Sequence, residues 1–159
     1  RCLLPGSPLP DPVTLVARAQ QAGHDYSAIY LLNNLVFGII QNRCPGAPVT
    51  EVDTALATLL RNPAFAISAA DLLQMQGFMA AGRGDFATAA NRAALSFAER
   101  EDVRVALYRT TWLLRAGQIE QARSELQLLD TAYREAIAAN ADLTARYRFL
   151  REELGLAVP

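Results

Sequence analysis

Apolar and polar positions along this chain recur with the spacing of amphipathic α-helices. Near the C-terminus, Leu143, Tyr147, Leu150 and Leu154 follow one another at intervals of three and four residues, with arginine and glutamate between them. This spacing places apolar side chains on one face of a helix over about 142–154, and charged side chains on the other. A helix with one apolar face at the end of a chain is expected to cap a stack of helices.

Turn and helix-breaking residues divide the remainder of the chain into further helical segments. Residues 1–12 contain four prolines and predict an extended strap, in which Asp11-Pro12 is a typical helix start. Apolar segments then alternate with glycine, proline and asparagine breaks, which predicts an all-α fold of about seven or eight helices. The first helices are expected over about 12–22, 26–42, 50–61 and 68–81.

Two of these helices are predicted to start at side-chain caps. Thr50 with Asp53, and Ser68 with Asp71, each place a hydroxyl oxygen at the helix start and a carboxylate three residues later. The hydroxyl can accept a hydrogen bond from a free backbone N–H, and the helix dipole favours the carboxylate. Pro63 is expected to end the first of the two helices.

A spacing of glycine, bulky residue and alanine occurs twice in the second half of the chain. The two copies are 33 residues apart: Gly84, Phe86 and Ala89, then Gly117, Ile119 and Ala122. Glycine allows the chain to reverse between two helices within very few residues, and alanine allows the two backbones to approach closely. A fixed period near this length is typical of stacked helix hairpins.

This pattern resembles the tetratricopeptide repeat. In that family a small residue in the first helix is followed by a turn glycine, an aromatic residue and an alanine. Gly77, Gly84, Phe86 and Ala89 match these positions in turn. The resemblance implies a right-handed stack of antiparallel helix hairpins, with a C-terminal capping helix.

The second copy departs from the family pattern at two positions. Ile119 stands in place of the aromatic residue, and Thr110 stands where the first copy has glycine. The clearest repeats therefore cover 68–100 and 101–133, and the resemblance extends by extrapolation to a single helical domain over 13–159.

Composition favours a globular domain and argues against nucleic acid as a partner. Apolar residues make up 52% of the 159 residues, and 15 basic residues against 16 acidic ones give a net charge of −1. Disordered chains contain fewer apolar residues, and nucleic-acid-binding domains carry a concentrated positive face. All of the basic residues are arginine, which is explained by codon usage in a GC-rich bacterium or, alternatively, by an arginine-rich recognition surface.

The most apolar stretch of the chain, Ala28 to Ile40, is too short to span a membrane. A membrane-spanning helix needs about 20 consecutive apolar residues. This stretch is shorter and contains Asn33 and Asn34 in its middle. It predicts a helix that is buried on most of its sides.

The two cysteines, Cys2 and Cys44, lie in segments rich in proline and glycine and in no metal-ligand spacing. Such segments make a disulfide sterically easy, and a Cys2–Cys44 bridge would place the domain outside the cytoplasm. Two reduced thiols are the alternative. The chain begins with Arg1 rather than methionine, so we expect it to be a processed or truncated part of a longer protein.

No catalytic, cofactor or metal site is predicted. His24 is the single histidine, and no serine or cysteine is placed near it in a known catalytic motif. The acidic pairs are expected near helix ends, where they act as caps or solvated charges: Glu51 and Asp53, Glu101 and Asp102, and Glu152 and Glu153. General acid–base catalysis would need one carboxyl in a dry cleft.

The resemblance does imply a partner-binding groove. In tetratricopeptide stacks the first helix of each pair lines an inner groove in which partner peptides lie. The groove positions of the family can be placed on this chain through the matched Gly77 and then shifted by one repeat. This assigns six residues to the groove: Asp71, Gln74, Phe78, Arg104, Thr111 and Arg115. This is a mixed polar surface with one exposed aromatic and two guanidinium groups that can bind a carboxylate. The alternative is that they are ordinary solvated residues.

The expected function is a non-catalytic scaffold that binds a protein or peptide, with self-association as a further possibility. We expect it to be the periplasmic, or otherwise extracytoplasmic, part of a bacterial envelope protein, tethered through a membrane region outside this sequence. Similar helical tails occur on multi-pass membrane proteins that handle surface glycans, so an accessory domain of such an enzyme is one alternative. A cytoplasmic adaptor or assembly chaperone is the other. Fold alone does not choose among them.

Overall fold

A computed structural model describes residues 12–41 and 49–157, and over these residues the protein is helical, with no strand. This confirms the predicted all-α class, although the number of helices exceeds the expected seven or eight. The described chain contains nine α-helices and one 3₁₀ helix: α1 Pro12–Gln21, α2 Asp25–Ile40, α3 Val49–Arg61, η1 Pro63–Ser68, α4 Ala69–Gly82, α5 Phe86–Glu99, α6 Val103–Arg115, α7 Ile119–Ala132, α8 Arg134–Ala138 and α9 Ala141–Glu153.

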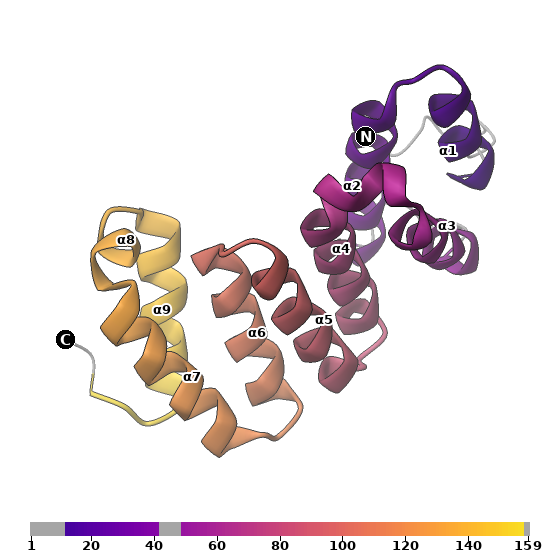
Figure 1. Cartoon of the computed structure of the whole chain (residues 1–159). Coiled ribbons are helices and arrows are strands. Elements are labelled where there is room, and N and C mark those ends of the chain that lie inside the picture. Colours follow the sequence, from indigo (N-terminus) through magenta and orange to yellow (C-terminus); the bar gives the residue numbers. More distant parts are fainter. Residues whose placement is uncertain (1–11, 42–48, 158–159) are drawn as a thin grey trace.

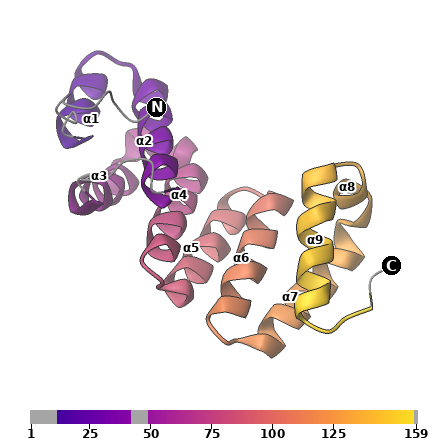
Figure 2. The ribbon, with the colours of Figure 1, turned by 180° about the vertical axis from the view of Figure 1, so that it is seen from behind.

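Helices that follow one another in the sequence lie side by side, so the chain progresses from α1 at one end to α9 at the other (Figure 1). Helix α4 packs on α5, α5 on α6, and α6 on α7. Helices that are not consecutive also pack together: α1 on α3, α2 on α4, and α6 and α7 on α9. Figure 2 looks onto the side that carries α2, α6 and α9, whereas α7 lies in front in Figure 1.

The two predicted glycine turns have the same local structure. Gly84 and Gly117 have φ angles of 81° and 76°, in the left-handed region that favours glycine. Each glycine N–H donates to the carbonyl three residues earlier, and the following residue donates to the carbonyl five residues before it. The alanines five positions after these glycines, Ala89 and Ala122, are fully buried. The bulky positions differ, because Phe86 packs against the core from a half-buried position, whereas Ile119 is 36% exposed.

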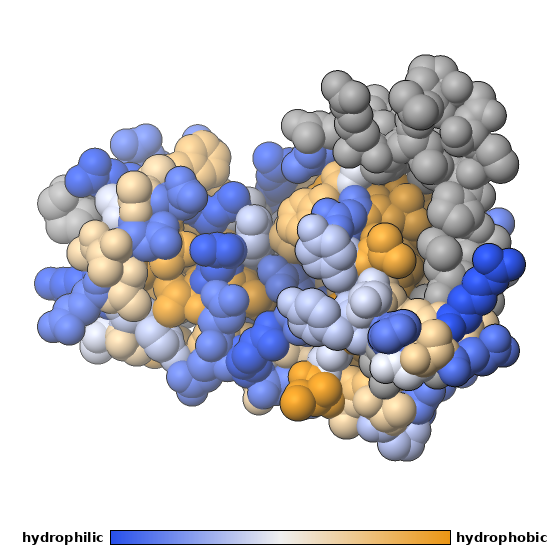
Figure 3. Space-filling model, turned by 90° about the horizontal axis from the view of Figure 1, so that it is seen from above, coloured by the Kyte–Doolittle hydropathy of each residue, from blue (hydrophilic) through white to orange (hydrophobic). Residues whose placement is uncertain are grey.

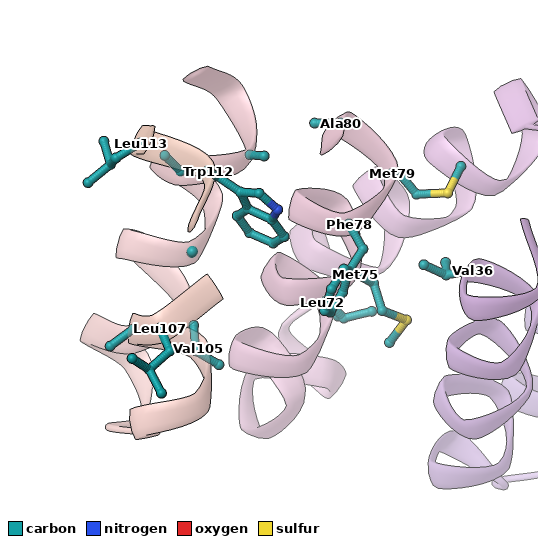
Figure 4. Packing of buried hydrophobic residues seen from close by; sticks show 14 of the residues in the cluster. Val36, Leu72, Met75, Phe78, Met79, Ala80, Val105, Leu107, Trp112 and Leu113 are labelled. Atoms are coloured by element: carbon teal, nitrogen blue, oxygen red, sulfur yellow. The ribbon is translucent and has the colours of Figure 1, made fainter. Parts of the chain in front are cut away.

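One hydrophobic core runs through the stack from α2 to α9. Figure 4 shows its centre, where the indole of Trp112 projects from α6 toward α4, and Met79 and Val36 meet between α4 and α2. Residues such as Leu72 and Leu107 are completely buried. Each aliphatic side chain of this size stabilises the fold by about 1.5–3 kcal/mol when it is withdrawn from water.

The helix caps differ from the predicted ones. Thr50 is not a cap, because α3 already begins at Val49. Ser68 precedes α4 as expected, yet its side chain makes no capping hydrogen bond, since it also ends the 3₁₀ helix. Side-chain oxygens accept from backbone N–H groups at four other helix starts: Asn62, Asp85, Asp102 and Asn140. The two short helices, η1 and α8, were not predicted from the sequence.

The predicted C-terminal helix is confirmed as α9. Tyr147, Leu150 and Leu154 are buried, and Leu143 packs against the core from a half-buried position. Most of the predicted strap, and both Cys2 and Cys44, lie outside the described residues. Pro12 is the exception, because it is the first residue of α1. Across 12–41 and 49–157, every helix is too short or too polar to cross a lipid bilayer.

Candidate functional site

Side chains from α2, α4, α6 and α9 line a continuous groove. It consists of two adjoining cavities, of about 320 and 510 Å³, that share Arg104 and Tyr108. Seen from above, the surface is hollowed between the C-terminal helices and the N-terminal half (Figure 3). The first cavity is lined from α2 and α4 by Tyr26, Ile29, Tyr30, Asn33, Phe37, Asp71, Gln74 and Met75, and the second from α9 by Asp142, Leu143, Ala145, Arg146 and Phe149.

One face of α2 supplies the aromatic wall of this groove. Tyr26, Tyr30, Asn33 and Phe37 follow at intervals of four, three and four residues, so they lie along one side of the helix. Tyr26 and Tyr30 are 82% and 60% exposed. Tyrosine offers a large apolar ring with a polar end, which suits it to contacts with a partner.

Below the groove lies a cluster of aromatic rings. The ring of Phe78 contacts those of Phe37, Tyr108 and Trp112, with centroid distances of 5.2, 4.8 and 5.3 Å. Tyr108 stacks on Trp112 at 5.8 Å. Phe78, expected as an exposed groove residue, is therefore 7% exposed and supports the groove from beneath. Phe37, Tyr108 and Trp112 cover the ring of Phe78, and the family pattern did not include these three residues.

Two arginines line the α6–α9 half of the groove. The guanidinium carbon of Arg146 lies 4.3 Å from the centre of the Tyr108 ring, a cation–π contact. Arg104 is exposed beside the same tyrosine. Neither arginine forms an ion pair with any residue in the described part of the chain. Asp142 is the one acidic residue that lines their cavity.

The acidic residue on α4, Asp71, is already paired. Arg100 donates to both of its carboxylate oxygens, at 2.5 and 3.2 Å. The hydrogen bond to Asp71 raises the pKa of Arg100. The charge of Asp71 is therefore balanced within the protein, which leaves Arg104 and Arg146 against Asp142 as the charges of the groove that have no ion pair with the described residues.

Two carboxamide side chains face the groove from neighbouring helices. Asn33 on α2 and Gln74 on α4 line the same cavity, and neither side chain has a hydrogen-bond partner within residues 12–41 and 49–157. A carboxamide can donate and accept at once, which matches the donor and acceptor of a peptide group.

Of the six residues assigned to the groove from the sequence, three meet in it. Asp71, Gln74 and Arg104 line one cavity. Thr111 lies outside the two cavities and donates to the carbonyl of Leu107 at 2.8 Å. Arg115 lies over the ring of Phe86 at 5.6 Å, at the base of the preceding hairpin.

No known family matches this chain. Neither a scan against protein-family models nor a search among curated proteins finds a match, and no solved structure is similar to it. Assignment of the groove therefore depends on its own geometry and chemistry.

A third cavity, of about 180 Å³, lies among α7, α8 and α9, but its polar groups bind each other. Arg151 donates to the Tyr147 hydroxyl at 2.6 Å, and Arg134 donates to Asp130 at 3.1 Å. Hydrogen bonding to Tyr147, followed by Arg134, lowers the pKa of Asp130, and burial raises the pKa of Tyr147. This network joins the last three helices and pairs the polar groups of the cavity except Arg148, which is exposed and has no ion pair with the described residues.

The acidic pairs serve structural purposes where the structure shows a partner. Asp53 binds Arg83 at 2.6 Å, Glu101 accepts from the Tyr133 hydroxyl at 3.1 Å, and Asp102 caps α6. In 12–41 and 49–157 no group of three histidine, cysteine or carboxylate side chains could hold a metal ion.

The groove residues on α2 and α9 were not predicted from the sequence. The family pattern was anchored on Gly77 and extended in steps of one repeat, so it did not reach these two helices. A signal was nevertheless present, since the spacing of Tyr26, Tyr30, Asn33 and Phe37 marks one helix face.

Proposed function

We propose that this protein is a non-catalytic scaffold that binds an extended peptide segment of a protein partner in the groove of α2, α4, α6 and α9. The observation that carries the proposal is the lining of that groove. Exposed tyrosines, two carboxamides without hydrogen-bond partners within the described chain, and two arginines without ion pairs there face the same hollow. Surfaces that bind partners are enriched in tyrosine and arginine.

We further propose that the helices form a tetratricopeptide-like stack. The shared hydrogen-bond pattern at Gly84 and Gly117 supports it, as does the complete burial of Ala89 and Ala122. In such a stack one helix of each pair faces inward, which is consistent with the groove being lined by α4 and α6 but not by α5 or α7.

An extracytoplasmic location, in an envelope protein, is part of the same proposal. It depends on the predicted Cys2–Cys44 bridge, which thiol titration of the native protein tests. A bridged protein shows no titratable thiol before reduction and two after it. Two thiols in protein taken directly from an oxidising compartment would instead favour the cytoplasmic adaptor.

Selection from a random library of displayed 12-residue peptides tests the groove itself. Asn33→Ala/Gln74→Ala removes both carboxamides from the groove, and Asn91→Ala/Gln127→Ala removes the same two side-chain types from exposed positions on α5 and α7. We expect peptides selected on the wild type to bind the second variant equally well and the first variant about fivefold more weakly or worse. Equal binding to both variants would contradict a peptide site in the groove.

A further inference from the structure

From the distribution of charge and aromatic surface we infer which kind of peptide the groove takes: an extended segment of about nine residues with apolar side chains in one half and carboxylates in the other. This inference rests on the proposed function and adds the chemistry of the partner. The apolar half would lie on Tyr26 and Tyr30 of α2, and the acidic half beside Arg104 and Arg146 of α6 and α9.

The length of the bound peptide follows from the number of helices that line the groove. Packed helices are about 8–10 Å apart, so the three steps between four helices span about 27 Å. An extended peptide advances about 3.3 Å per residue. About eight or nine residues therefore reach from the tyrosines of α2 to Phe149 on α9.

Charge complementarity assigns the acidic half. Arg104 and Arg146 adjoin Tyr108 and have no carboxylate partner in the described part of the chain. Of the two acidic residues of the groove, Asp71 is already bound to Arg100, and Asp142 lines the cavity of both arginines without an ion pair to either. This cavity therefore has two arginines and one carboxylate, and carboxylates on a bound segment would form the ion pairs that the described residues do not form there.

Exposed aromatic surface assigns the apolar half. Tyr26 and Tyr30 are among the most exposed large side chains of the described residues, and Ile29 and Met75 line the cavity between their helices. No arginine of α2 or α4 lines this part of the groove. An apolar anchor placed here would remove tyrosine ring surface from water.

Between the two halves the lining is suited to a peptide main chain. Asn33 and Gln74 face the groove from adjacent helices and can each pair with a peptide group. A nucleic acid can also pair with carboxamides, through its base edges. The groove, however, has only two arginines without ion pairs and one such carboxylate, Asp142, and it lacks the concentrated positive face of a nucleic-acid site. This small charge excess favours a peptide over the other anionic chains.

Paired libraries of nine-residue peptides test the inference. Both hold leucine, phenylalanine or tyrosine in one half and serine and glycine in the middle. One library has two glutamates in the other half, and the second has glutamine at the same two positions. We expect the glutamate library to bind the wild type about tenfold more tightly, because each exposed ion pair contributes about threefold.

The protein variants identify the side chains responsible. Arg104→Gln/Arg146→Gln should bind the two libraries with equal affinity, so that the preference for glutamate is lost. Arg148→Gln is the matched control, since Arg148 is exposed on α9 outside the groove and forms no ion pair with the described residues. It should retain the tenfold preference.

The outcomes separate the inference from the proposed function. Equal binding of both libraries in the groove would overturn the inference and leave the peptide-binding function standing. Absence of binding by either library would overturn both. A single-stranded DNA oligonucleotide that displaces the glutamate library from the wild type, but not from the double variant, would show that the arginines serve a nucleic acid and would overturn the peptide assignment.

Discussion

A β-carbon placed on Gly77 of α4 would lie 3.0 Å from the Cζ3 atom of Trp112 on α6. The same position would be 3.3 Å from the carbonyl oxygen of Ala89. Glycine at this point therefore allows the indole to lie directly against the α4 backbone, and the indole in turn supports Tyr108 under the groove. Gly77, the first residue matched to the repeat pattern, is therefore needed for the close packing of α4 and α6, two helices that line the groove.

We predict that Gly77→Ala destabilises the protein by about 1 kcal/mol. Alanine in a helix gains roughly 1 kcal/mol over glycine. Overpacking against the indole and the Ala89 carbonyl costs about 1–3 kcal/mol and outweighs that gain. Urea denaturation of wild type and variant measures the difference, and the same substitution in a Trp112→Phe background should be close to neutral. A stabilising effect in both backgrounds would show that the contact does not constrain position 77.

Replacement of the turn glycines should act through backbone conformation alone. Nothing lies within 4 Å of a β-carbon built on Gly84 or Gly117, yet both have positive φ angles. Gly84→Ala and Gly117→Ala are each expected to cost about 1 kcal/mol, and asparagine should cost less. The effects should be similar and additive, because the two turns share one geometry. Thermal denaturation measures both effects. A loss of stability on replacement of only one of the two glycines would show that the two turns are not equivalent.

Low pH should reduce the stability of the packing among the C-terminal helices, because the carboxylate of Asp130 becomes protonated. Hydrogen bonding to Tyr147 and Arg134 lowers the pKa of Asp130, so its charged form is favoured in the folded state. The resulting stability is present above the unfolded pKa of about 3.9 and is lost as the pH falls through the lower, folded value. The difference in unfolding free energy between wild type and Asp130→Asn should therefore narrow below about pH 4.

The control for this pH series is Thr131→Ala, a neighbour that does not titrate. Thr131 donates to the carbonyl of Gln127, so its replacement alters a local hydrogen bond without removing a charge. Its effect on unfolding should be the same at pH 7 and at pH 3. A difference for Asp130→Asn that stays constant over that range would show that its charge does not stabilise the fold.

Tyr30→Ser should reduce peptide binding with little change in stability. The side chain is 60% exposed, and substitutions at such positions usually change stability by less than about 0.5 kcal/mol. Loss of an aromatic contact in a binding site weakens affinity by about tenfold. Leu128→Ser is the control, because Leu128 is 66% exposed on α7, away from the groove. Equal affinity of the two variants for a selected peptide would show that Tyr30 is not part of the binding site.

The helices were predictable from the sequence where a periodic apolar face coincided with a clear turn. Gly84 and Gly117 mark reversals that only a left-handed backbone conformation allows, and α9 shows its apolar face in the spacing of Leu150 and Leu154. Caps were less predictable. Thr50 and Ser68 have suitable side chains, but the helix start depends on where the preceding segment ends, and η1 extends directly into α4.

The groove was predictable only in its central part. Gln74 and Arg104 follow from the repeat period, whereas Phe78 is buried because Phe37 and Tyr108 pack against it from other helices. That burial depends on how α2 and α6 are placed relative to α4, which spacing within one repeat does not specify. Arg146 was missed for the same reason, since α9 carries no copy of the motif.

The most direct test of the groove follows the side-chain amide signals of asparagine and glutamine by NMR while a selected peptide is added. We predict that the amide resonances of Asn33 and Gln74 shift in proportion to the bound fraction, and that those of Asn91 and Gln127, on α5 and α7, do not shift. Shifts at Asn91 and Gln127 with none at Asn33 and Gln74 would contradict it, because the partner would then bind the opposite side of the stack.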